Sequence, residues 1–220
     1  MKRLCVLVLL GLSACGGLAQ LRTARTVPLG KIETTLSLGY NHNEMVKERG
    51  WGPNNLPTQL NIRWGLSDNV DMGARTFFYL GAIVDTKWRV YDDHRFAFAV
   101  SGGVGGAAVE ATVLHVPVHV LGSWQATPWL SPYMALGYGA FWLWGYKPEH
   151  PPDLSNPLVT QAPWQAHGDG MLMAHLGLEL GSPKGTAWLL EYALLRPVLD
   201  NEGDNHQFAT NHLFLTGVRF

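Results

Sequence analysis

Stretches in which apolar and polar residues alternate recur from residue 31 to the end of the chain. At 112–124, for example, the apolar Leu114, Val116 and Val118 are separated by His115 and Pro117. This period of two is typical of β-strands, and no segment has the i, i+3, i+4, i+7 spacing of an amphipathic helix. The expected strands cover residues 31–40, 58–66, 70–79, 82–91, 95–105, 112–124, 130–146, 171–181, 186–196 and from about 208 to the end. The sequence therefore predicts an all-β domain at 30–220 with about ten strands (8–12).

The connections between these strands are alternately short and long. The short ones follow the second, fourth, sixth and eighth strands, at 67–69, 92–94, 126–129 and 182–185. The longest follow the first, seventh and ninth strands, at 41–57, 147–170 and 197–210. All long connections are therefore expected at one end of the domain, with both termini at the other. Tight turns at one end and longer loops at the other are typical of transmembrane barrels, so we expect a closed antiparallel up-and-down transmembrane β-barrel.

The first fifteen residues have the features of an export signal. Two basic residues at 2 and 3 precede an apolar run at 4–12, which is too short to span a bilayer as a helix. The Leu-Ser-Ala-Cys stretch at 12–15 resembles the lipobox of bacterial lipoproteins, which implies removal of residues 1–14 and acylation of Cys15. The alternative is cleavage after Ala19, because small residues stand at positions 17 and 19. Residues 15–29 are expected to form a loose periplasmic linker.

Tryptophan positions decide which face of the strands meets lipid. Alternation alone fits either a soluble barrel with an apolar interior or a membrane barrel with an apolar exterior. The tryptophans on the apolar face of their strands gather near the short connections, at Trp64, Trp88, Trp124 and Trp188. A ring of indole side chains at one level is typical of a membrane–water interface. The sequence therefore predicts that the apolar face looks outwards.

The last strand ends with Phe220, which falls on the same outward face and at the same level as this aromatic girdle. An alternating strand with a terminal aromatic residue resembles the C-terminal signal of Gram-negative outer-membrane barrels. The resemblance implies location in the cell outer membrane, long loops on the extracellular side and recognition by the barrel-assembly machinery. It also implies contact with outer-membrane lipid and lipopolysaccharide.

The polar face is then the interior, where acidic and basic residues match in number. We expect a lumen charge network of Glu33, Asp71, Asp85, Glu179 and Glu191 with Arg63, Arg75, Lys87, Arg89 and Arg219. An unpaired charge in such an interior would cost several kcal/mol. If residues 79–81 form the third connection, the predicted pairs are Asp71–Arg89 and Arg75–Asp85, and barrel closure adds Arg219–Glu33. About ten strands enclose a lumen that these side chains largely fill.

Histidines also fall on the inward face, at His115, His119 and His175. His115 and His119 are separated by about 13 Å along their strand, so together they cannot chelate one ion. We interpret these two as neutral lumen hydrogen-bonding groups and expect no metal site and no cofactor, the alternative being a site completed by cross-strand partners. Acidic and histidine side chains in the long connections, such as Asp153, Asp200, Asp204 and His206, match no zinc or EF-hand spacing.

Three function classes remain open. The favoured one is a non-catalytic envelope protein, for surface recognition or as a narrow conduit. An outer-membrane enzyme resembling omptins or lipid A deacylases is the alternative, although no catalytic residues are identified and the outward His212 has no serine two residues later. A lipid-anchored carrier resembling lipocalins is the third. A net charge of −1 gives no basic footprint for nucleic acid.

Overall fold

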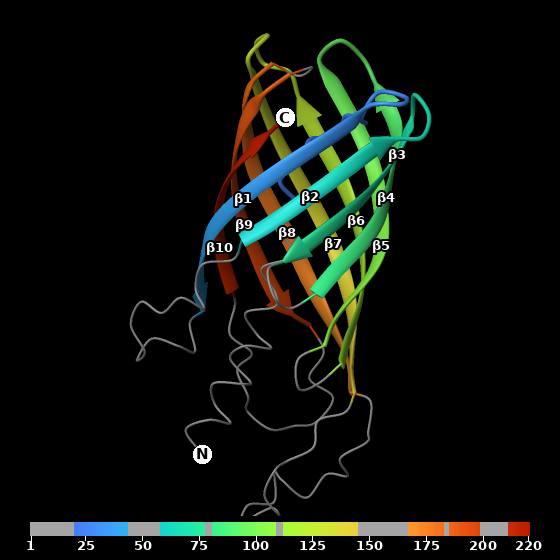
Figure 1. Cartoon of the computed structure of the whole chain (residues 1–220). Helices are drawn as coiled ribbons and strands as arrows, with labels where there is room; N and C mark the ends of the chain where they lie inside the picture. Colours follow the sequence, from blue (N-terminus) through green and yellow to red (C-terminus); the bar gives the residue numbers. More distant parts are fainter. Residues whose placement is uncertain are drawn as a thin grey trace, which may run out of the picture.

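The computed structural model describes residues 20–43, 58–77, 81–108, 112–144, 167–182, 185–198 and 211–220. Ten strands cover most of them: Ile32–Asn43 (β1), Thr58–Gly65 (β2), Val70–Phe77 (β3), Gly81–Asp92 (β4), Phe96–Ala108 (β5), Thr112–Trp124 (β6), Leu130–Trp144 (β7), His167–Gly181 (β8), Ala187–Pro197 (β9) and Asn211–Arg219 (β10). Each strand pairs antiparallel with its neighbours in the chain, and β1 pairs with β10 to close the barrel (Figure 1). The closed up-and-down barrel predicted from the sequence is confirmed. Among the described residues, no helix is long and apolar enough to cross a membrane.

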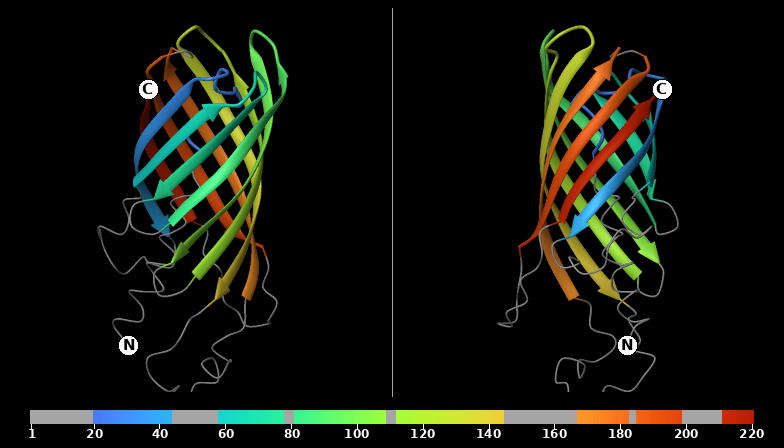
Figure 2. Two further views of the ribbon diagram at one scale, coloured as in Figure 1. Left: turned by 45° about the vertical axis from the view of Figure 1, so that its right-hand side comes forward. Right: turned by 90° about the vertical axis from the view of Figure 1, so that its left-hand side faces the viewer.

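The short connections and the C-terminus lie at one end of the barrel, whereas most of the predicted long connections lie outside the described residues. The C-terminus lies at the end that carries the short β4–β5 and β6–β7 connections (Figures 1 and 2). In the β4–β5 turn, the Asp93 carboxylate accepts hydrogen bonds from the backbone N–H groups of Phe96 (2.6 Å) and Arg95 (2.7 Å). These bonds stabilise the charged carboxylate and lower its pKa. The same bonds join Asp93 to the backbone on the other side of the turn and so stabilise the turn. We refer to this end as the short-turn end.

The outer wall of the barrel is apolar and the inner wall carries the charges. Val120 and Leu136 on the outer face are 57% and 59% exposed, whereas Arg63 and Asp71 are 1% and 0% exposed. Further exposed apolar side chains of the outer wall are Leu36, Leu38, Val84, Val104, Val118, Met134, Leu172, Leu176 and Phe214. A water-soluble barrel has the opposite distribution, because burial of apolar side chains drives its folding. The parity assigned from the sequence is therefore correct.

The interior is less uniformly charged than the sequence predicts. Ionic side chains concentrate on β2, β3 and β4, while the opposite part of the inner wall is mostly apolar. Its buried members are Met171 and Met173 on β8, Leu189, Ala193 and Leu195 on β9, and Leu213 and Leu215 on β10. These three strands have apolar residues on both faces, so one apolar set must face inwards. This part of the inner wall thus combines apolar side chains with Glu179, Glu191 and Arg219.

Candidate functional site

Most of the predicted lumen charges lie buried inside the barrel. Those less than 9% exposed are Arg63, Asp71, Arg75, Asp85, Lys87, Glu179, Glu191 and Arg219. Glu33 and Arg89 are only partly buried. Arg89 pairs instead with Asp92, a partly exposed neighbour on the same strand. The lumen network therefore forms, with these two residues at its margin.

Two of the three predicted ion pairs are present. Arg75 Nε lies 3.4 Å from Asp85 Oδ2, and Arg219 Nε lies 3.6 Å from Glu33 Oε2. Arg219 makes a shorter contact with Glu179, at 2.7 Å from Nη1 to Oε2. The closure of the barrel between β1 and β10 is therefore accompanied by a carboxylate–guanidinium cluster, as the sequence predicts.

The third predicted pair, Asp71 with Arg89, is wrong. Asp71 pairs with Arg63, and its Oδ2 lies 3.3 Å from Lys87 Nζ. The reason is the register of β3 and β4, in which Asp71 stands opposite Lys87 and Phe77 opposite Gly81. The connection is thus 78–80 rather than 79–81, which shifts the pairing by two residues. An even shift leaves every side chain on its predicted face, so alternation cannot detect it.

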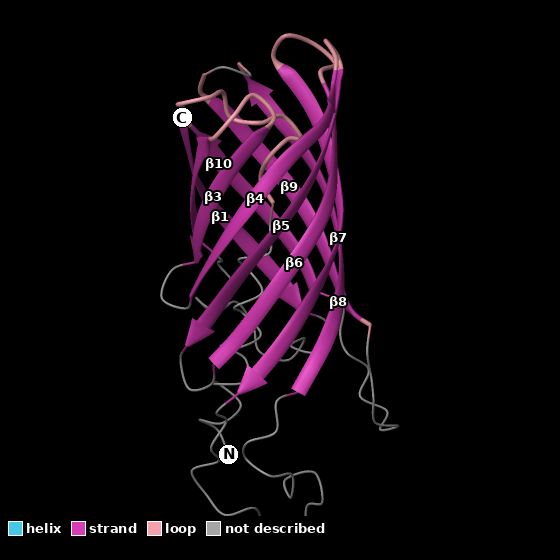
Figure 3. Cartoon of the chain, turned by 90° about the vertical axis from the view of Figure 1, so that its right-hand side faces the viewer, coloured by secondary structure: helices cyan, strands magenta, loops and turns pink. Residues whose placement is uncertain are grey.

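The segment at 20–30 is not a loose linker, because it enters the barrel. Its buried residues are Gln20, Leu21, Arg22, Thr23, Ala24 and Val27, with exposed fractions of 6% or less. The segment leaves the lumen at the short-turn end. There the Gly30 N–H donates to the Gly65 carbonyl of β2 at 3.1 Å. In Figure 3, a stretch of chain drawn as a pink loop runs inside the wall of magenta strands. We call residues 20–28 the luminal segment.

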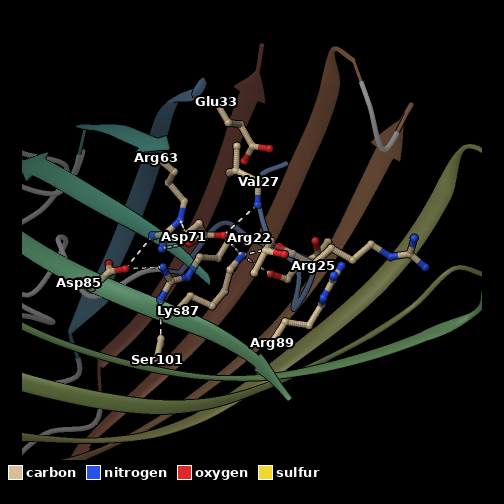
Figure 4. Close-up of polar contacts among 12 residues, drawn as sticks. Arg22, Arg25, Val27, Glu33, Arg63, Asp71, Asp85, Lys87, Arg89 and Ser101 are labelled. Carbon is tan, nitrogen blue, oxygen red and sulfur yellow. Dashed lines mark hydrogen bonds and ion pairs between the residues drawn. The ribbon is translucent and has the colours of Figure 1, made fainter. Parts of the chain in front are cut away.

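The luminal segment crosses the lumen from wall to wall. At one side, the backbone N–H groups of Gln20 and Leu21 donate to Glu191 on β9, at 2.8 Å and 2.6 Å. At the other, Arg22 Nη1 lies 2.7 Å from Asp85 Oδ1 on β4, and Nη2 donates to Ser101 Oγ at 2.8 Å (Figure 4). Strands β4 and β9 are five places apart in the ring of ten and so stand on opposite walls. Three consecutive residues therefore bridge the full width of the barrel.

Further along the luminal segment, its backbone is bound to the charged wall. Lys87 Nζ donates to the carbonyl oxygens of Thr23 (3.2 Å) and Arg25. The Val27 N–H donates to Asp71 Oδ2 at 3.0 Å. Wall charges thus satisfy backbone groups that burial would otherwise leave unpaired, at a cost of roughly 1–3 kcal/mol each.

The three predicted lumen histidines are all buried on the inner wall. His119 Nε2 lies 2.9 Å from the Gln20 side-chain amide, and His175 Nδ1 lies 3.1 Å from Glu191 Oε1. The rings of His119 and His175 meet edge to face, with centroids 5.5 Å apart. His119 therefore holds the end of the luminal segment directly, while His175 contacts the carboxylate of Glu191, which binds the same end. Within the described ranges, no group of three histidine, cysteine or acidic residues is placed to hold a metal ion.

Gly65 on β2 makes room for the luminal segment. A Cβ atom at this position would lie 2.1 Å from the Pro28 carbonyl oxygen and 2.5 Å from that of Val27. Both are backbone atoms, so the segment itself would have to move. The absence of a side chain at this one strand position is therefore part of how the segment enters the barrel.

Replacing Gly65 with alanine is expected to displace the luminal segment at its entry and to destabilise the protein by roughly 1–3 kcal/mol, the range for overpacking. Trypsin should then cut after Arg22 or Arg25 in outer-membrane preparations, where the unchanged protein resists. The control is Gly185→Ala in a short connection, where a Cβ would meet nothing nearer than 3.6 Å. Equal resistance of the Gly65→Ala variant would show that the segment does not need this passage.

The predicted aromatic girdle lies on the outer wall at the short-turn end. Trp88, Trp124, Trp188 and Phe220 are 45–65% exposed there, and Trp64 is half-buried. Trp129, in the connection between β6 and β7, is 59% exposed at the same end. Trp129 was not predicted as part of the girdle, because the alternation of strands assigns no face to a turn residue.

Cys15 and the acidic and histidine residues Asp153, Asp200, Asp204 and His206 lie outside the described residues. His212 is described, and its Nδ1 lies 2.7 Å from the Tyr192 hydroxyl on the outer wall.

No protein-family model matches the chain, and no curated protein matches it. Solved structures that are similar include the outer membrane protein Ail of Yersinia pestis, with 15% identity over 86% of this chain and 100% of that chain and a TM-score of 0.36. The N-terminal β-barrel domain of Pseudomonas aeruginosa OprF has 11% identity over 86% and 97%, with a TM-score of 0.32. The NanC porin has 13% identity over 85% and 98%, with a TM-score of 0.44. These similarities are too low to transfer any property to this chain, whose fold assignment rests on its own strand register.

Proposed function

We propose that this chain is a non-catalytic β-barrel of the Gram-negative outer membrane, closed by its own luminal segment and acting through its long outer connections. One observation carries the proposal: apolar side chains cover the outside of a closed barrel whose interior holds the ionic ones. In water, exposed leucine and valine side chains all around the wall would promote aggregation. In a bilayer the same wall is the favourable one, and closure leaves no unpaired strand edge.

The lipocalin-like carrier is not proposed, because it requires the opposite distribution. Such a carrier would keep Asp71, Arg75, Asp85 and Lys87 on its water-exposed side. They lie inside, each 3% exposed or less. This alternative from the sequence analysis is therefore wrong in its main requirement.

A conduit is the weaker candidate within the proposed class. The luminal segment binds β3, β4, β5, β6 and β9 across the lumen, so a solute entering from the short-turn end would meet it. Closure at one level is sufficient to stop passive flow. The resting barrel is therefore proposed to be closed.

The long connections are the proposed recognition surface. Loops on a rigid barrel are where binding residues usually stand, and the 147–170 connection combines several prolines with Trp164. The outer wall would contact lipid and lipopolysaccharide, and β10 with its terminal Phe220 would be read by the barrel-assembly machinery.

The decisive experiment is extraction of isolated outer membranes at high pH, followed by electrophoresis with and without heating. A transmembrane barrel is expected to stay in the membrane pellet, because each extracted strand would expose its apolar face to water. Its gel mobility is expected to change on heating, when the compact barrel unfolds. Release into the supernatant would contradict the proposal.

A further inference from the structure

The Glu191 carboxylate is enclosed by donors at the inner end of the luminal segment. Its Oε1 accepts from the Gln20 N–H and its Oε2 from the Leu21 N–H, while the Tyr133 hydroxyl donates to Oε2 at 3.0 Å. Leu21 has φ of +41°, a conformation uncommon for a residue with a side chain. Successive backbone N–H groups around a left-handed residue form a concave anion site. The backbone at Gln20 and Leu21 thus encloses this carboxylate.

Glu191 differs from the other buried acidic residues in its charge partners. Asp71, Asp85 and Glu179 each lie within 4 Å of an arginine or lysine nitrogen. Among the described residues, the ion-pair contact of Glu191 is with His175, which is neutral unless protonated, and the charge of Arg75 also attracts Glu191. An ionised carboxylate that is buried without a permanent cation in direct contact is costly. A positive charge at the first N–H would reduce that cost.

We propose that the chain is cut between Ala19 and Gln20, and that the new α-ammonium group of Gln20 is the cationic partner of Glu191. Glycine and alanine at positions 17 and 19 supply the small residues that signal peptidase requires before such a cut. Gln20 N already lies 2.8 Å from Glu191 Oε1, so the ammonium group forms in place. The Gln20 side chain is held by His119 and by Arg22, which fixes the residue beside the carboxylate.

The alternative cut, before an acylated Cys15, would constrain the chain between the lipid and Gln20. The acyl chains must reach the bilayer, and the five residues from Cys15 to Gln20 span at most roughly 18 Å. From Glu191 to the start of β9 at Ala187 the wall already extends about 13 Å. Lipid attachment at Cys15 would therefore leave roughly 5 Å of slack if Gln20 stayed beside Glu191, and would hold the intervening residues nearly fully extended.

The inference rests on export, which is part of the proposed function. N-terminal sequencing of the mature protein distinguishes failure of the proposed cleavage site from failure of export. Outer membranes from cells producing the full chain are expected to yield a protein that starts at Gln20 and carries no acyl mass. Cys15→Ala should leave this terminus unchanged, whereas Ala19→Arg should accumulate the precursor. A mature protein starting at an acylated Cys15 would overturn the inference and leave export intact. A chain with residues 1–19 still attached in the wild type would overturn both.

The contact with Glu191 is tested by a double-mutant cycle. One serine inserted after Ala19 moves the ammonium group by one residue and places a neutral amide beside Glu191. We expect the insertion to lower the unfolding temperature of the barrel, but to have little further effect in a Glu191→Gln background, where the charge is absent. Sequencing confirms that the inserted serine is the new first residue. An equal loss in both backgrounds would overturn the ammonium–carboxylate pair.

Discussion

Replacing Asp85 with asparagine is expected to lower the free energy of unfolding by roughly 3–5 kcal/mol, the range for breaking a buried ion pair. Its carboxylate Oδ1 lies 2.7 Å from both Arg22 Nη1 and Arg63 Nη1, and Arg75 approaches Oδ2 at 3.4 Å. The neutral amide would leave three guanidinium groups in the lumen without their shared counter-charge. Urea-induced unfolding of the purified barrel in lipid vesicles measures the loss.

The control for this prediction is Asp92→Asn on the same strand. Asp92 also pairs with an arginine, Arg89, but both side chains are partly exposed at the short-turn end. Exposed pairs of this kind contribute about 0–1 kcal/mol, so the control should unfold almost like the unchanged protein. Similar losses in the two variants would mean that the lumen network does not stabilise the barrel more than a surface pair does.

The wall of the barrel was predictable because its signal is local and repeated. A strand with lipid on one side needs apolar residues at every second position, and Val116, Val118 and Val120 keep that period wherever the neighbouring strands lie. The short connections fix which ends of the strands meet. Face, strand order and closure follow from these two patterns without knowledge of any long-range contact.

The register between strands was not predictable in this way, because alternation repeats every two residues. Asp71 opposite Lys87 and Asp71 opposite Arg89 both place a carboxylate beside a cation on the inner wall. Charge complementarity therefore could not choose between the two registers. Alternation does not choose either, because both registers keep every side chain on the same face.

The luminal segment was not predictable from its own residues. It has no period, and its small and polar residues resemble those of a linker. Its position depends on contacts with Glu191 and Asp85, which are 171 and 63 residues away from their partners in the chain. Among the sequence features, Arg22 offered a signal: it adds a cation outside the strands to a lumen whose strand charges already balance. That excess is accommodated because Asp85 accepts several guanidinium groups at once.

Deleting residues 22–27 is expected to convert a silent barrel into one that conducts, with stepwise currents in planar bilayers. The deletion keeps Ala19, Gln20 and Leu21, so the proposed cleavage site is unchanged, but two residues before Pro28 cannot reach across the lumen. The wall should still fold, because the two acidic residues that contact the deleted residues keep wall partners. Asp85 retains Arg63 and Arg75, and Asp71 retains Lys87.

A peptide with the sequence of residues 20–28 provides the control for this last prediction. Added at the short-turn side of the deletion variant, it should reduce the current by binding again to Glu191, Asp85 and Asp71. The same peptide with Arg22→Glu should have no such effect, because its carboxylate would face Asp85 at the site where the guanidinium pairs at 2.7 Å. Like charges at that separation repel in a buried lumen far more than in water. If the unchanged barrel conducts as well as the deletion variant, or if both peptides act equally, the segment is not the element that closes the barrel.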